Sequence, residues 1–224
     1  MTLYVADEFF AFGDQKTVDE HLEERRKAML KRVADIDPDH LRKIGTDKAV
    51  ENLVRDFTLA PPEIDFDHSV EPEVVPKPKV PHPSLPTPPG NPIRTLRYGY
   101  HMKTGSPSDL RYMPKVREGT PVKAYRSDNA VIFDVYSFNC PPSKQDQIHA
   151  TRTYLESNGA RAVEQFKAYN AALRNKVVAA VQQKMRDIQS GEDDINEIRG
   201  LWSRMRVSCA RRRGYLSLNG RSAQ

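Results

Sequence analysis

Histidines are the first residues to test for chemistry, because imidazole is a common metal ligand and general base. No two of the six stand at a metal-ligand spacing: His21, His40, His68, His82, His101 and His149. The chain also has no GxGxxG or P-loop phosphate motif, no HExxH zinc motif and no GxSxG nucleophile motif. The sequence therefore predicts a non-catalytic protein with no cofactor and no metal.

Two other groups could carry chemistry. Glu192, Asp193 and Asp194 supply three adjacent carboxylates, and carboxylate oxygens suit Mg²⁺ or Ca²⁺. No EF-hand pattern surrounds them, so we interpret them as a solvated acidic loop. The cysteines, Cys140 and Cys209, lie too far apart in sequence for a disulfide framework or a zinc motif. Reduced thiols of this kind indicate a cytoplasmic protein.

The C-terminal 30 residues are arginine-rich and contain no acid after Glu197. Guanidinium groups near aromatic rings suit phosphate neutralisation and base stacking. The alternatives are a basic terminus that makes no such contact, or pairing with the acidic N-terminal hairpin, since residues 1–70 carry 16 acidic and 10 basic residues. On the first interpretation, nucleic acid would contact Arg204, Arg206, Arg211, Arg212, Arg213 and Tyr215.

The longest run with a helical period extends over residues 143–188. Ser143 is a candidate N-cap with Asp146 in a capping-box position. The run is one long helix, or two helices broken near Asn158-Gly159, and Ser190-Gly191 is its predicted end. A coiled-coil-like face for a partner or a second copy would consist of Val163, Phe166, Asn170, Leu173, Val177 and Val181.

Asn170 is a polar residue within this apolar stripe. Its amide could hydrogen-bond to neighbouring backbone, or lie at a partly exposed position. Alternatively, a buried Asn could fix the register of a helix pair.

Residues 1–60 are predicted to form a helical hairpin. The first helix begins near Asp14 or Thr17, and Asp37-Pro38 ends it, because the residue before proline avoids helical geometry. Thr46 or Asp47 is expected to cap the second helix, which stops before Pro61. Phe9, Phe10 and Phe12 precede the hairpin as a strap expected to pack on a helix.

Residues 61–92 contain 11 prolines. That density favours an extended polyproline II connector and excludes a helix or a central strand. Pro83-Ser84-Leu85-Pro86 matches PxxP, which would be either a docking ligand for an aromatic groove or a chance feature of a spacer.

Residues 93–139 have the period of short strands separated by turns. Residues 131–138 alternate, with Val131, Phe133 and Val135 on one face. Further strands are expected from Ile93 to Met102, Leu110 to Met113 and Val122 to Tyr125. An antiparallel sheet packed on the long helix gives an α+β fold. We predict an α+β domain over residues 93–190, followed by a basic tail over 191–224.

Short motifs resemble those of a recurring, largely uncharacterised family of bacterial proteins. They are Thr104 to Pro107, Leu110 to Pro114 and Tyr169 to Leu173, within about residues 45–188. The chain departs from that pattern at Tyr169, where the family favours Phe, and at Met113. The resemblance implies an accessory component, in some cases associated with defence or restriction genes.

Two functions remain open. The first is a non-catalytic interaction or adaptor protein of a bacterial system that binds a protein partner or a second copy. The second is a nucleic-acid-binding module that uses the Arg-rich tail. No run of 18 apolar residues is present, so no contact with a membrane is expected.

Overall fold

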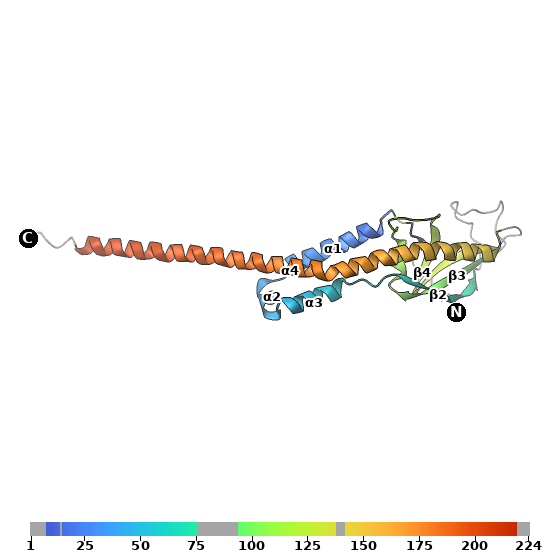
Figure 1. Cartoon of the computed structure of the whole chain (residues 1–224), viewed down its shortest axis with the longest axis horizontal. Helices are drawn as coiled ribbons and strands as arrows, with labels where there is room; N and C mark the ends of the chain where they lie inside the picture. Colours follow the sequence, from blue (N-terminus) through green and yellow to red (C-terminus); the bar gives the residue numbers. More distant parts are fainter. Residues whose placement is uncertain (1–7, 14, 76–93, 138–141, 219–224) are drawn as a thin grey trace, which may run out of the picture.

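The computed structural model describes the backbone of residues 8–13, 15–75, 94–137 and 142–218, and side chains as far as Trp202. It has the predicted α+β fold, with a five-stranded antiparallel sheet at one end of a very long C-terminal helix (Figure 1). The elements in chain order are β1 (Glu8–Ala11), α1 (Val18–Ala34), α2 (Pro38–Ile44), α3 (Thr46–Phe57), β2 (Glu63–Val74), β3 (Arg94–Thr104), the 3₁₀ helix η1 (Pro107–Arg111), β4 (Val122–Ser127), β5 (Ala130–Ser137) and α4 (Lys144–Leu218).

The sheet has the strand order β1-β4-β5-β3-β2, and every neighbouring pair is antiparallel. In the central strand β5, Val131, Phe133 and Val135 join the main core, and Ile132 lies in a small cluster on the opposite face. The predicted alternation of this strand is therefore confirmed. Gly99 of β3 lies opposite Ile132, where a Cβ would approach the carbonyl oxygen of Val131 to 2.3 Å.

Two parts of the predicted sheet were wrong. Residues 63–74, predicted as Pro-rich connector, form the edge strand β2. An edge strand tolerates Pro72 because one side of its backbone needs no ladder partner. The β2–β3 register also shifts between Val70 and Glu73, the interval that contains Pro72. The strand predicted from Leu110 to Met113 is instead η1, capped by Ser106 with Pro107 in its first turn. The PxxP segment at 83–86 lies outside the described residues.

The N-terminal helices begin at signals that are mostly visible in the sequence. Thr17 and Glu20 form a reciprocal capping box at the start of α1. Helix α1 ends at Ala34 with Asp35 as its C-cap, slightly before the predicted end at Asp37-Pro38. Asp37 caps α2, whose first residue is Pro38. The cap predicted at Thr46 or Asp47 is wrong, because Gly45 occupies the N-cap of α3 with a φ of +81° and no side-chain hydrogen bond.

Helix α4 begins as predicted and does not end where predicted. Ser143 and Asp146 form a capping box, with the Ser143 amide donating to the Asp146 carboxylate at 2.9 Å. The helix passes through Asn158-Gly159 and Gly191 without a break and contains 75 residues, which is a length of about 110 Å. An interior glycine costs only about 1 kcal/mol in a helix, and no proline follows Pro142.

Helix α4 is the spine on which the rest of the chain is arranged (Figure 1). Its first third lies across one face of the sheet, and its middle third packs against α1 and α3. As expected, an aromatic of the N-terminal segment meets a helix: the rings of Phe12 and Tyr154 lie 6.2 Å apart. We call the sheet, α1 to α3 and α4 as far as Ile188 the body.

Three side-chain amides of α4 tie separate segments to this spine. Each donates to the carbonyl oxygen and accepts from the amide of a single residue. Asn158, which has no exposed surface, binds Glu118 at 3.0 and 3.1 Å. Asn170 is thus half-buried and bonded to the backbone of Leu59, a neighbour in space that follows α3 in the chain. The three pairs are Gln147 with Tyr136, Asn158 with Glu118, and Asn170 with Leu59.

Candidate interaction surface

The helix face predicted to bind a partner is covered within the chain. Phe166 and Val177 have no exposed surface, and both belong to the main core with residues of α1 and α3. The prediction failed because an apolar stripe shows that a helix face is buried, and cannot show what buries it. The structure places the predicted face as follows: Phe166, Leu173, Val177 and Val181 are buried, and Val163 and Asn170 are half-buried.

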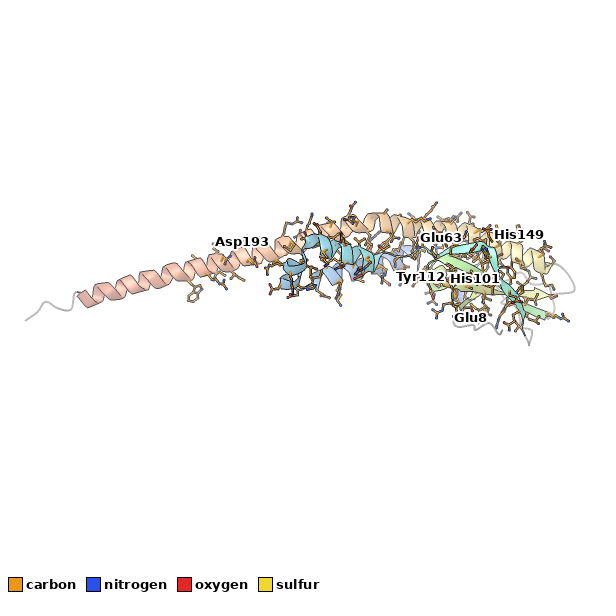
Figure 2. All side chains as sticks on the ribbon, turned by 90° about the horizontal axis from the view of Figure 1, so that it is seen from below. Glu8, Glu63, His101, Tyr112, His149 and Asp193 are labelled. Atoms are coloured by element: carbon orange, nitrogen blue, oxygen red, sulfur yellow. The ribbon has the colours of Figure 1, made fainter. Side chains whose placement is uncertain are left out.

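The body ends close to Ile188. Lys184 donates to the carbonyl oxygen of Ala34 at the end of α1, at 2.8 Å. Ile188 packs on the edge of the main core, and Arg42 of α2 pairs with Glu192. In Figure 2 the labelled Asp193 marks the point where α4 leaves the other helices.

Beyond this point α4 continues as a projection (Figure 1). We call residues 189–218, which follow the last core residue Ile188, the α4 extension. Its 30 residues correspond to about 45 Å. Large apolar side chains on it face solvent, although a monomeric protein rarely exposes a contiguous apolar stripe. Their exposed fractions are 51% for Ile195, 53% for Ile198, 48% for Leu201 and 63% for Trp202.

The exposed stripe has the period of a coiled coil. Ile195, Ile198 and Trp202 are separated by three and then four residues, and Met205 and Cys209 continue the same alternation. This is the a and d pattern of a heptad repeat. The signal was present in the sequence, but the predicted helix end at Ser190-Gly191 separated it from the helix that carries it.

The residues predicted as a basic tail, from 191 to 218, belong to α4, and their acids precede their arginines along the helix. Glu192, Asp193 and Asp194 are helical, so the predicted acidic loop was wrong. The backbone of residues 204, 206, 211–213 and 215 continues the helix, while their side chains lie outside the described part. Position 204 is 12 residues beyond the Glu192–Arg42 pair, or about 18 Å along the axis. Pairing of these arginines with the N-terminal hairpin stays a prediction, because their side chains lie outside the described part.

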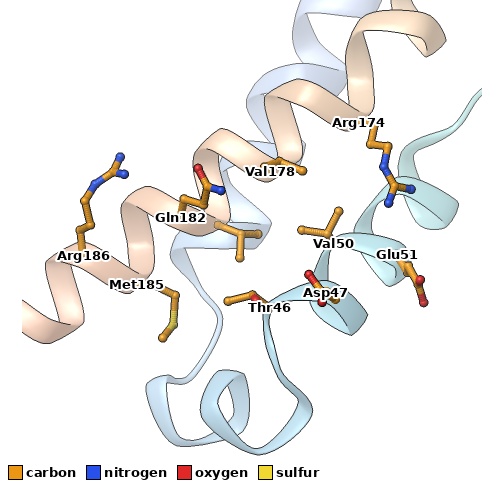
Figure 3. Close-up of a pocket in the computed structure, with 10 residues that line it drawn as sticks. Thr46, Asp47, Val50, Glu51, Arg174, Val178, Gln182, Met185 and Arg186 are labelled. Carbon is orange, nitrogen blue, oxygen red and sulfur yellow. The ribbon is translucent and has the colours of Figure 1, made fainter.

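A groove lies between α3 and α4 (Figure 3). It has a volume of about 630 Å³, and Val50, Val178 and Met185 supply its apolar lining. The charged side chains at its margin, Glu51 and Arg174 among them, are exposed. Among the residues drawn, no buried polar group points into the groove, so its geometry supports no particular chemistry.

His21 and His68 make contacts that pack or stabilise the fold. His21 stacks on Tyr112 with ring centroids 4.1 Å apart, and its pKa is lowered, first by burial and then by Lys16 and Arg25. His68 lies 2.8 Å from Asp65 at the surface. Within the described part of the chain, no group of three His, Cys, Asp or Glu residues could hold a metal ion.

Tyr125 and Asp134 form a buried tyrosine–carboxylate pair on the sheet face opposite α4. Tyr125 donates from its hydroxyl to Asp134 at 2.8 Å. Burial, followed by this hydrogen bond, raises the pKa of Tyr125 far above its ordinary value. Arg97 of the neighbouring strand lies over the Tyr125 ring and 3.9 Å from Asp134. We interpret the three residues as a packed polar cluster of the sheet.

Comparison of the chain with protein-family models, curated proteins and solved structures gives no match. The resemblance of residues 45–188 to a bacterial family therefore stays a prediction. Within the described residues, no helix is both long and apolar enough to cross a membrane.

Proposed function

We propose that this protein is a non-catalytic interaction protein whose α4 extension docks onto another polypeptide. The observation that carries this proposal is the exposed apolar stripe of Ile195, Ile198, Leu201 and Trp202. It lies beyond the Arg42–Glu192 ion pair, on the part of α4 that projects from the body (Figure 1). Aromatic and aliphatic side chains of this kind are typical anchors of helix-mediated binding. We place this activity in the bacterial cytoplasm, on the basis of the cysteine pattern and the family resemblance.

The energetics of the α4 extension support docking. Most helix stability in proteins comes from packing of an amphipathic face, and an isolated helix is marginal in water. The α4 extension also contains Gly191, Gly200 and Gly214, each of which costs about 1 kcal/mol relative to alanine. A partner that covers the stripe would supply the packing that α1 and α3 supply to the body.

The proposal predicts contact at one side of the α4 extension. A photo-crosslinking amino acid is placed at position 202 of the full chain and, as the control, at position 196, which is exposed and lies outside the a and d stripe. Irradiation of the purified protein and of expressing cells should give polypeptide adducts from position 202 and far fewer from 196. Equal or absent adducts at both positions would refute docking through the stripe.

The second candidate function is nucleic-acid binding, favoured by the basic half of the α4 extension. Residues 199–218 contain six arginines and no acid. Phosphate-driven binding would fall steeply between about 50 and 200 mM salt. Titration of labelled DNA and RNA with the full chain and with a chain ending at Gln189 tests this function. Salt-sensitive binding lost on truncation and on Arg211→Ala/Arg212→Ala/Arg213→Ala would support it, and equal binding by all three chains would exclude it.

A further inference from the structure

We infer that the partner of the α4 extension is a second copy of this chain, bound antiparallel as a two-helix coiled coil. This inference rests on the proposed function and names its partner. Three features of the α4 extension lead to it: the heptad pattern, the segregation of charge along the helix, and the position at which the body ends.

Charge favours the antiparallel orientation. Residues 187–198 contain five acids and no base: Asp187, Glu192, Asp193, Asp194 and Glu197. Residues 199–218 contain six arginines and no acid: Arg199, Arg204, Arg206, Arg211, Arg212 and Arg213. A parallel pair would place acid against acid and arginine against arginine, which is repulsive. An antiparallel pair places the acidic segment of each copy beside the basic segment of the other.

The body limits the register. Antiparallel coiled coils place a positions of one helix against d positions of the other, so allowed registers differ by seven residues. One register places position 198 opposite 209, and 202 opposite 205, and it brings position 218 opposite 189. The partner's α4, which extends to Leu218, then reaches the edge of the body at Ile188 and does not run along it. The next register would bring position 218 opposite 182, beside Val181, which α1 and α3 already cover.

Cysteine pairing measures this register. Cys140→Ser leaves Cys209 as the chain's only thiol, and Ile198→Cys adds its expected opposite number. Mild oxidation of Cys140→Ser/Ile198→Cys should give a covalent dimer joined between positions 198 and 209, as read from peptide masses. Cys140→Ser alone should give almost no covalent dimer. Position 209 of one copy lies opposite position 198 of the other, so the two Cys209 thiols are about 16 Å apart along the helix axis, too far for a disulfide. Cys140→Ser/Asn196→Cys is the control for a thiol outside the seam.

The outcomes separate the orientation from the proposed function. A 209–209 link in Cys140→Ser would mean parallel pairing and would overturn the inference. A full chain that sediments as a monomer at all concentrations would also overturn it. In that case, adducts from position 202 to another protein would still support the proposed function, whereas a lack of such adducts would remove both proposals.

A charge-exchange experiment tests the orientation without cysteines. Asp193→Arg/Asp194→Arg/Glu197→Arg leaves one acid and three arginines in residues 189–198, so the α4 extension becomes basic at both ends. Arg211→Glu/Arg212→Glu/Arg213→Glu makes it acidic at both ends. Each variant should self-associate about tenfold more weakly or worse, since several ion pairs become repulsive. Mixing the two should restore dimers that contain one copy of each. Unchanged self-association of either variant would contradict the charge argument.

Discussion

Phe166→Ala is expected to destabilise the protein by about 3–5 kcal/mol, the range for removing a fully buried aromatic ring. Phe166 has no exposed surface and lies in the main core, with the His21 ring centroid 6.2 Å away. Truncation leaves a cavity at the point where α4 meets α1, and a rigid helix cannot close it. Domains are stable by only about 5–15 kcal/mol, so this loss is large. Urea unfolding followed by circular dichroism measures it.

Leu30→Ala is the matched control for this experiment. Leu30 also lies on a helix of the body, but 51% of its surface is exposed. Its truncation should change the free energy of unfolding by no more than about 0.5 kcal/mol. If the two variants lost equal stability, α4 would not be the packed spine that the structure describes.

Ending the chain at Gln189 is expected to have the opposite effect: association lost and stability kept. The truncation retains Ile188 and the core. It removes the Arg42–Glu192 ion pair, and such exposed pairs contribute about 0–1 kcal/mol. The melting temperature of the truncated monomer should therefore lie within about 4 °C of that of Ile198→Glu/Trp202→Glu, a full-length chain with a disrupted stripe. Sedimentation should show both as monomers at concentrations where the full chain dimerises.

This comparison separates folding from association. Because dimerisation itself raises apparent stability with concentration, the thermal scans need dilute protein. A truncated chain that still dimerised would locate the interface in the body. A large loss of stability in the truncated monomer would show that the α4 extension supports the body, and docking would then no longer explain its exposed stripe.

Local signals predicted much of the fold. The Thr17 and Ser143 caps and the alternation of β5 depend on neighbouring residues, and such residues are visible in sequence. β2 was missed because proline at an edge strand and proline in a connector give the same composition, and only pairing with β3 distinguishes them. β1 was missed because its four residues pair with β4 more than 100 positions away.

The sequence predicted the apolar faces of α4 but not which of them is exposed. The period of Val163 to Val181 correctly indicated a buried helix face, but the covering helices α1 and α3 come from the same chain. The spacing of Ile195, Ile198 and Trp202 fits a helix, although Gly191 and the acids after it suggested an end. Those signals are weak, about 1 kcal/mol for an interior glycine. Exposure of the stripe follows from the lengths of α1 to α3, which no local pattern encodes.

The emission spectrum of Trp202 over a range of protein concentrations tests the central claim most directly. Trp202 is the only tryptophan of the chain, and 63% of its surface is exposed in the single copy. Docking of two α4 extensions predicts a shift to shorter wavelength as concentration rises, with the same midpoint as dimerisation measured by sedimentation. An unchanged, water-exposed spectrum at concentrations where sedimentation shows a dimer would contradict docking through the stripe. The same spectrum with a monomer throughout would contradict self-association.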